Sequence, residues 1–274
     1  MLWGLTSGGW TSGLTAGADD PYRAQIELLG EYDLHATEWS AGHLLQMEPG
    51  RLEQIAGWLQ ERDVHVCLGL HCHWLSDDAG QLEQETETAM QAVDTLAEMM
   101  RTPLCGTGLS RQYHHYSRDL PLAEQVERFA EAMAPLAKHC FDAGCPLSIH
   151  KVAHFGEDLA ALCSRAPGLG VLLDTGNAFL IGELPVAAAR ACAAYTWGSH
   201  FKDHYAFPNF NPIGLHLKGA VPGQGDAGLR EIYGILLDEA PEPDKLVMLM
   251  EIDPVEGLTQ RQALAQAVEF VNSL

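Results

Sequence analysis

The chain has 274 residues, 47% of them hydrophobic, and 37 acidic against 16 basic residues give it a formal net charge of -21. An acidic surface of this kind repels phosphate backbones and anionic lipid heads, so nucleic acids and membranes are poor partners. No apolar run reaches the roughly 18 residues that a membrane-spanning helix needs, and no signal-peptide pattern stands at the N-terminus. We therefore expect a cytoplasmic protein whose partners are small molecules, neutral or chelated to a metal.

The seven cysteines indicate the same compartment. Their number is odd, no C-x-x-C pair occurs, and most of them lie in apolar contexts. Free cysteine in such a context behaves as a small hydrophobic residue, which suits a reducing cytoplasm. The spacing favours neither a disulfide framework nor a cysteine-based zinc site.

Short apolar runs alternate along the chain with amphipathic stretches of helical period. The predicted strands are residues 2–7, 33–39, 65–71, 103–108, 146–151, 169–174, 195–202 and 245–251. The predicted helices are residues 21–32, 48–63, 81–101, 122–144, 155–165, 184–194, 227–240 and 258–274. Strict alternation predicts a parallel sheet, and eight such pairs in about 250 residues favour a closed α/β barrel, the (β/α)₈ TIM barrel. We predict a single domain over residues 1–274, with a long loop at 203–226.

Ionisable and polar residues gather where the predicted strands end. In chain order they are Glu38, His71, His73, His150, Lys151, Asp174, Asn177, His200, Lys202, Asp203, Glu251 and Asp253. Because function in a barrel resides at the carboxyl ends of the strands, these side chains are expected to converge on one face. Any single one of them is more often an ordinary loop residue, but the pattern repeats over six strands and therefore predicts a site.

Four of these residues form a candidate metal centre: His150, Asp174, His200 and Glu251. Two imidazoles and two carboxylates suit Mn²⁺, Zn²⁺, Co²⁺ or Fe²⁺ better than Mg²⁺, which prefers oxygen ligands. Open positions on such an ion would accept a hydroxy-carbonyl substrate. The competing interpretation is that Asp174 in LLDTGN merely caps the following helix.

At these residues the chain resembles the xylose isomerase-like TIM barrel superfamily of sugar isomerases, ketose epimerases, inosose-type dehydratases and apurinic endonucleases. The matching segments are TEWS, GLHCHW, LLDTGN, HFKD, PGQGD and MEID, so the resemblance spans almost the whole chain. It implies that Asp174, His200 and Glu251 are metal ligands. It also implies that His71, Asn177 and Lys202 are pocket residues and that Asp203 is a ligand or supports one.

One position departs from the family pattern. Where the family carries a glutamate at the end of strand five, this chain reads LSIHKV and places His150 there. A histidine can bind a metal and, with a pKa near neutrality, can move protons. The symmetrical mechanism with two carboxylates is then no longer assured. The adjacent Lys151 is a candidate substrate-binding cation, and Glu38 is a candidate substrate ligand.

We therefore predict a metal-dependent isomerase or epimerase of a small sugar or hydroxy-ketone, with Glu251, His150 and Lys202 as catalytic residues. A dehydratase or lyase acting on a keto-sugar or keto-cyclitol through the same site is the first alternative. A metal-free, degenerate barrel with a binding role is the second. The acidic surface disfavours the endonuclease branch. Loop aromatic residues such as Trp10 and Trp74 are candidates for stacking on a sugar ring, and a homo-oligomer is compatible with such a barrel.

Overall fold

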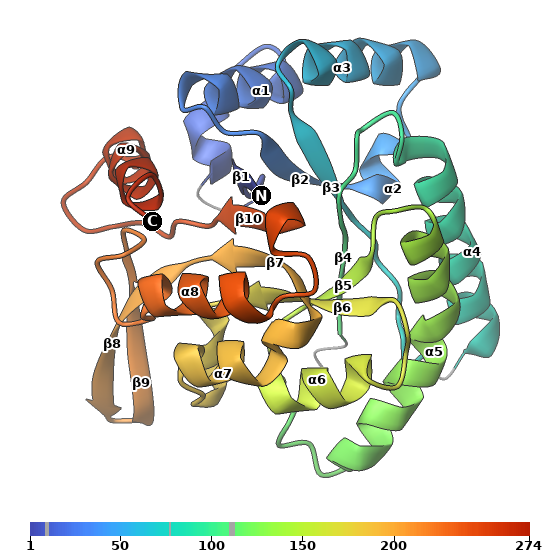
Figure 1. Ribbon diagram of the computed structural model, residues 1–274, viewed down its shortest axis with the longest axis vertical. Helices are drawn as coiled ribbons and strands as arrows, with labels where there is room; N and C mark the ends of the chain where they lie inside the picture. Colours follow the sequence, from blue (N-terminus) through green and yellow to red (C-terminus); the bar gives the residue numbers. More distant parts are fainter. Residues whose placement is uncertain (9–10, 77, 110–112) are drawn as a thin grey trace.

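The structure, a computed structural model, describes residues 1–8, 11–76, 78–109 and 113–274 (Figure 1). Within these residues eight parallel strands close into a barrel in the order β1-β10-β7-β6-β5-β4-β3-β2. The strands are β1 (Leu2–Leu5), β2 (Ala36–Ser40), β3 (His65–Gly69), β4 (Cys105–Gly108), β5 (Leu147–His150), β6 (Leu169–Asp174), β7 (Thr196–Phe201) and β10 (Val247–Met250). The predicted TIM barrel is confirmed.

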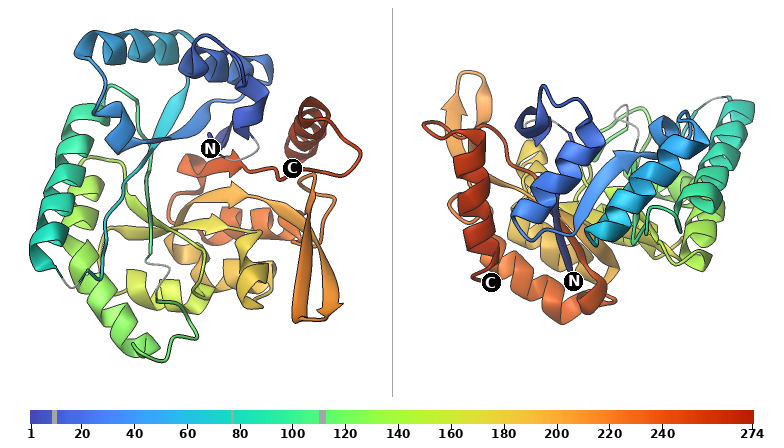
Figure 2. Two further views of the ribbon diagram at one scale, coloured as in Figure 1. Left: turned by 180° about the vertical axis from the view of Figure 1, so that it is seen from behind. Right: turned by 90° about the horizontal axis from the view of Figure 1, so that it is seen from above.

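Helices surround the barrel in the predicted order (Figures 1 and 2). They are α1 (Pro21–Glu31), α2 (Ala41–Leu44), α3 (Pro49–Glu61), α4 (Ala79–Leu96), α5 (Leu122–Asp142), α6 (Gly156–Cys163), α7 (Pro185–Cys192), α8 (Leu229–Glu239) and α9 (Gln260–Val271). The short helix α2 is an addition that the sequence did not predict. Short 3₁₀ helices add η1 (Thr11–Thr15), η2 (Asn177–Ile181), η3 (Ala193–Tyr195) and η4 (Pro243–Lys245). Among the described residues, no helix combines the length and the apolar character that crossing a membrane requires.

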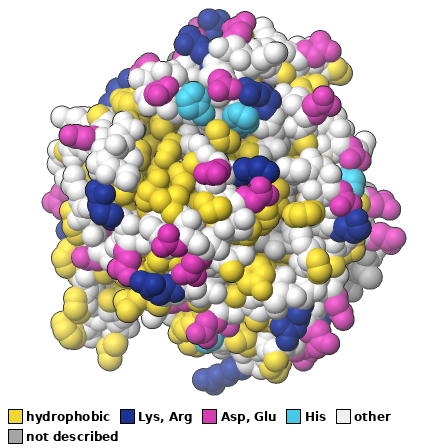
Figure 3. Space-filling view, in the orientation of Figure 1, with side chains coloured by type: hydrophobic (Ala, Val, Ile, Leu, Met, Phe, Trp, Pro, Cys, Tyr) yellow, Lys and Arg dark blue, Asp and Glu magenta, His cyan; other side chains and the backbone are white. Residues whose placement is uncertain are grey.

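The apolar core has two parts, as a barrel requires. A large cluster packs between the strands and the helices, and a small one fills the barrel with side chains such as Cys67, Leu172 and Leu249. Strand β6 is buried at every position, because a parallel strand is covered on both faces. On the face shown in Figure 3, acidic side chains are dispersed with Lys and Arg between them rather than gathered in one block.

The segment predicted as a long loop is instead mostly a β-hairpin, which corrects the sequence interpretation. Strands β8 (Asp203–Phe210) and β9 (Ile213–Ala220) pair in antiparallel fashion and project from the barrel (Figure 2). Pro208 and Gly214 weaken a strand prediction, but both strands of an isolated hairpin are edges, where proline is tolerated; Pro212 lies in the turn between them. The tip is open to solvent, with Phe210 85% and Ile213 93% exposed.

Candidate active site

Side chains alternate between the two faces of a strand, and this alternation directs the strand-end residues into the barrel. In β6, Leu172 belongs to the cluster inside the barrel, so Asp174, two residues later, faces the same way. The same spacing after β10 places Glu251 inside. The strand register pairs Asp174 with His200 and Leu172 with His150, which brings the ends of β5, β6 and β7 together at one end of the barrel.

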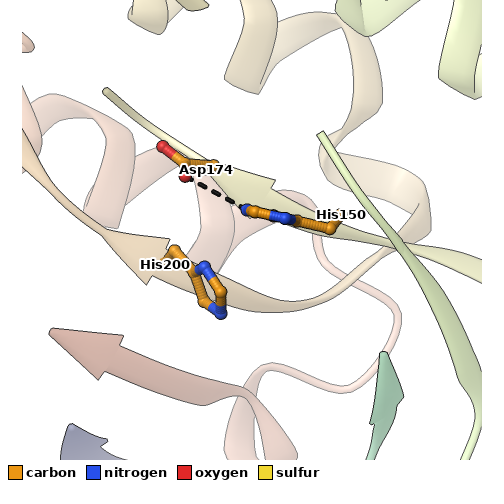
Figure 4. Close-up of side chains that lie close together, drawn as sticks. All are labelled: His150, Asp174 and His200. Atoms are coloured by element: carbon orange, nitrogen blue, oxygen red, sulfur yellow. Dashed lines mark hydrogen bonds and ion pairs between the residues drawn. The ribbon is translucent and has the colours of Figure 1, made fainter. Parts of the chain in front are cut away.

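Three of the four predicted metal ligands form a compact cluster (Figure 4), and Glu251 is not part of it. His150, Asp174 and His200 each offer a ligand atom, and these atoms all lie within 4.8 Å of one another. His150 Nε2 lies 3.1 Å from Asp174 Oδ2, and the two imidazole rings lie with their centroids 4.5 Å apart. Two nitrogen donors and one carboxylate fit a borderline ion such as Zn²⁺ or Mn²⁺, and they leave coordination positions for other ligands.

Asp174 is fully buried and is held in place by Asn177. The backbone N–H of Asn177 donates to Asp174 Oδ1 at 2.8 Å, and its side-chain amide donates to Oδ2 at 2.6 Å. Asp174 therefore also caps the turn that begins η2, so capping and a place in the cluster are not alternatives here. Asn177 contacts the aspartate, and it is not among the residues that line the pocket described below.

His200 lies between two carboxylates. Its Nε2 is 3.0 Å from Glu38 Oε2, and its Nδ1 is 3.2 Å from Glu251 Oε2. The second contact lacks hydrogen-bond geometry, so Nδ1 is buried without a hydrogen-bond partner. Burial lowers the pKa of His200, but the two carboxylates outweigh burial and raise this pKa to about 10. Burial raises the pKa of Glu38, and the neighbouring His200 more than reverses that effect.

Glu251 also forms an ion pair with Lys202, whose Nζ donates to Oε1 at 2.7 Å. Burial raises the pKa of Glu251, but His200 and Lys202 hold this pKa well below its usual range. Burial lowers the pKa of Lys202, and Glu251 outweighs it, so the net shift is upward. At neutral pH Glu251 is therefore a carboxylate and Lys202 an ammonium group. Asp253 Oδ2 lies 3.3 Å from the same Nζ and 2.8 Å from His204 Nε2.

Asp203 binds a loop through backbone amides. Its two carboxylate oxygens accept hydrogen bonds from the N–H groups of His204, Gly223, Gly225 and Ala227, all between 2.9 and 3.0 Å. A Cβ at Gly225 would lie 2.3 Å from Asp203 Oδ1, so the loop needs glycine at that position. Asp203 thus fastens the PGQGD segment to the end of β7. It supports the site through the backbone.

Lys151 directly follows His150 but enters a different environment. Its side chain is fully buried, and Nζ lies 2.8 Å from Glu183 Oε2. The other oxygen of Glu183 accepts the backbone N–H of Gly156, the first residue of α6. Lys151 is absent from the pocket lining. The sequence indicated neither this pairing nor the role of Glu183.

A cavity of about 480 Å³ opens next to the cluster, a size that suits a small ligand. Of the predicted site residues, Glu38, His71, His150 and His200 line it. Residues that the sequence interpretation missed also line it, among them Ser7 and His154. The segment HKVAH, with a second histidine four residues after His150, was the available signal for His154. Trp10 lies outside the described residues, and Trp74 is buried with its Nε1 donating to Thr107.

His154 is oriented by a chain of hydrogen bonds. The amide group of Gln125 donates to the backbone oxygens of His114 and Leu120, so its Oε1 must accept, and His154 Nε2 lies 3.0 Å from it. Burial lowers the pKa of His154 to about 4. His154 is therefore a neutral imidazole that carries its proton on Nε2.

The sequence model of the xylose isomerase-like TIM barrel matches residues 26–274. The chain belongs to this family. A comparison with curated protein sequences finds no match. Family membership agrees with the barrel, with the strand-end cluster, and with the resemblance noted in LLDTGN, HFKD and MEID.

Solved structures of the same architecture cover nearly the whole chain. D-psicose 3-epimerase from Clostridium cellulolyticum H10, solved with D-tagatose, has a TM-score of 0.71 and 14% identity and covers 100% of this chain and 98% of its own. The probable 3-DHS dehydratase AsbF of petrobactin synthesis from Bacillus anthracis has 0.73 and 14%, covering 99% of each chain. The IOLI protein with a bound zinc atom has 0.73 and 13%, covering 100% and 97%. At these identities the likeness shows the fold alone.

Proposed function

We propose that the chain is a metal-dependent isomerase or epimerase of a small sugar or hydroxy-ketone. The observation that carries the proposal is the cluster of His150, Asp174 and His200 beside the pocket, with the ion pair of Glu251 and Lys202 next to His200 Nδ1. A divalent ion held by this cluster would polarise the carbonyl group of a chelating substrate. The similar structures that were solved with D-tagatose and with zinc support the same assignment.

In this proposal the residues of the chain divide the proton transfer between them. Glu251 is ionised, so it can accept the proton from the carbon next to the carbonyl group. Lys202 is protonated and 2.7 Å from Glu251, so it can stabilise the developing enediolate oxygen and return a proton. Because His150 belongs to the donor cluster, we assign it to metal binding rather than to the base.

A dehydratase is the second candidate, and one observation favours it. The end of β5 carries His150 and not a carboxylate, whereas Glu251 follows the end of β10. Of these two strand ends, only that of β10 therefore offers a carboxylate base to a substrate. One base suffices to remove a proton and expel a β-hydroxyl group as water, whereas epimerisation through opposite faces uses two groups. AsbF, the probable dehydratase with the same architecture, is consistent with this candidate.

Turnover in D₂O separates these functions. Protein supplied with Mn²⁺ or Zn²⁺ is incubated with D-fructose and with D-tagatose and followed by proton NMR and mass spectrometry. An isomerase or epimerase exchanges the α proton without loss of water, and a dehydratase releases water. Asp174→Asn should abolish either reaction. Glu85→Gln, which alters a partly buried carboxylate paired with the exposed His73, should not.

Metal analysis of protein purified without chelator tests the remaining possibility, a metal-free barrel. A metal content well below one ion per chain, with no turnover after addition of Mn²⁺ or Zn²⁺, would support a metal-free barrel with a binding role. Stoichiometric metal without turnover of either hexulose would contradict the sugar assignment and leave the metal centre.

A further inference from the structure

The two ring nitrogens of His200 have different surroundings. Nε2 makes a hydrogen bond with Glu38 Oε2 at 3.0 Å. Nδ1 is buried without a hydrogen-bond partner, although Glu251 Oε2 lies 3.2 Å away. A buried nitrogen without a hydrogen bond is costly unless something else binds it. In Figure 4 one nitrogen of the His200 ring faces Asp174 and His150, and the other faces away from them.

Glu38 reaches His200 from the other side of the barrel. Strand β2 is separated from β7 by β1 and β10 in one direction around the barrel. The neighbours of Glu38, Thr37 and Trp39, face α1, where Gln25 donates to Thr37 Oγ1 at 2.8 Å and accepts from Trp39 Nε1 at 2.8 Å. Because side chains alternate along a strand, fixing these two neighbours directs Glu38 inward. The position of Glu38 is therefore set by the fold and not by a flexible loop.

We propose that Glu38 is a positioning residue that accepts a hydrogen bond from the Nε2 proton of His200 and so orients the ring for an ion that binds Nδ1 in place of the Nδ1 proton. Histidine ligands of metals commonly donate their second N–H to a carboxylate, which fixes both the tautomer and the ring orientation. This inference rests on the metal centre of the proposed function. It also replaces the expectation from the sequence that Glu38 binds substrate.

The geometry distinguishes this role from direct metal binding by Glu38. Among the described residues, the donor atoms that lie within 4.8 Å of one another belong to His150, Asp174 and His200, and Glu38 is not among them. If Nε2 were the donor atom, the ion would have to displace the hydrogen bond to Glu38. If Nδ1 is the donor atom, the ion takes the position at which no hydrogen bond is lost.

Two substitutions and a matched control test the inference. Glu38→Ala removes the acceptor, Glu38→Gln keeps an oxygen that can accept the Nε2 proton, and Glu85→Gln makes the same change in a carboxylate 2.7 Å from His73 Nδ1. The affinity for Zn²⁺ is measured by competition with a chromophoric chelator. We expect Glu38→Ala to weaken binding by about 10- to 100-fold, Glu38→Gln by less, and Glu85→Gln not at all.

A second measurement reads the tautomer directly. In Zn²⁺-loaded protein labelled with ¹⁵N-histidine, His200, assigned by its absence in His200→Gln, should show a protonated Nε2 and a metal-bound Nδ1. In Glu38→Ala the Nε2 proton should exchange rapidly with water. Thermal melts of the metal-free variants check that each one folds.

The outcomes separate the two proposals. Zn²⁺ binding by Glu38→Ala as tight as that of the unmodified protein, or a His200 that binds zinc through Nε2, overturns the role of Glu38 alone. An unmodified protein that binds no Zn²⁺ overturns the metal centre, and the role of Glu38 with it.

Discussion

Two groups of ionisable side chains begin at the adjacent residues His150 and Lys151, and they differ in whether they lie beside the pocket. On one side His150 joins Asp174 and His200, next to the pocket and with a ring nitrogen of His200 that makes no hydrogen bond. On the other side Lys151 Nζ lies 2.8 Å from Glu183 Oε2, away from the pocket, and neither of these two atoms makes a hydrogen bond within the described residues either. The first group brings three possible ligand atoms together beside a cavity, whereas the second neutralises one charge with another inside the fold. Neither charge burial nor a missing hydrogen bond alone therefore identifies a site; convergence of donor atoms beside a cavity does.

The largest effect on metal affinity is expected when the cluster of His150, Asp174 and His200 loses its only carboxylate. Asp174→Asn should weaken Zn²⁺ binding by more than about 100-fold, which exceeds what loss of an outer partner usually costs. The reason is that the charge and the oxygen near His150 are removed, while the remaining amide oxygen can still accept one of the two hydrogen bonds from Asn177. Competition with a chelator measures the affinity. Binding that persists at the original strength would show that Asp174 only caps η2.

Breaking the ion pair of Lys151 and Glu183 should lower the stability of the fold and leave the metal affinity unchanged. Lys151→Met leaves Glu183 buried without its partner, which should lower the free energy of unfolding by about 3–5 kcal/mol. The double variant Lys151→Met, Glu183→Leu should recover most of this loss, because neither charge remains. Urea denaturation measures the free energy, and Zn²⁺ titration of the same variants is the control. A weakened Zn²⁺ affinity would place Lys151 in the site after all.

His154 tests an intermediate case, since it lines the pocket but is oriented by Gln125 in the interior. Its pKa is about 4 in the folded protein against 6.5 ordinarily, so between these values the unfolded chain binds more protons. The stability contributed by the neutral imidazole is therefore complete above about pH 6.5 and is lost as the pH falls toward 4. The free energy of unfolding should fall by about 3 kcal/mol over this range. His154→Gln should flatten this part of the stability profile, measured by urea denaturation at several pH values. An unchanged profile would contradict the prediction.

The smallest effect is expected at the hairpin tip. Phe210→Ser or Ile213→Ser changes side chains that are 85% and 93% exposed, so the free energy of unfolding should change by less than about 0.5 kcal/mol. Zn²⁺ affinity should stay the same. A clear change in the sedimentation of these variants at high protein concentration would instead reveal that the tip contacts another copy of the chain.

The sequence was informative where one physical constraint acted alone. Strands buried on both faces are continuously apolar, so LGVLLD and KLVMLM were recognisable as strands, and the groups after them were recognisable as strand-end groups. The hairpin was not, because Pro208 opposes strand pairing except at edges, and an edge is a property of the fold.

Partners across the barrel could not be predicted either. His200 and Glu38 are separated by 162 residues, and only the closure of the barrel brings them together. Lys151 and Glu183 meet because α6 and α7 pack side by side, which no local pattern encodes. Alternation along β5 indicated only that His150 and Lys151 should point in different directions. What Lys151 would meet there depended on the helices.

The β8–β9 hairpin leaves and rejoins the barrel at paired positions, Asp203 and Ala220, and its ladder continues to Phe210 and Ile213. Chain added between those last two residues would extend outward without shifting β7 or α8. No Asp, Glu, Lys or Arg occurs from residue 204 to 217, so the segment takes part in none of the ion pairs around Glu251 except through His204 at its root. The tip is therefore a natural place to insert a fluorescent reporter or an immobilisation tag while the pocket keeps its shape.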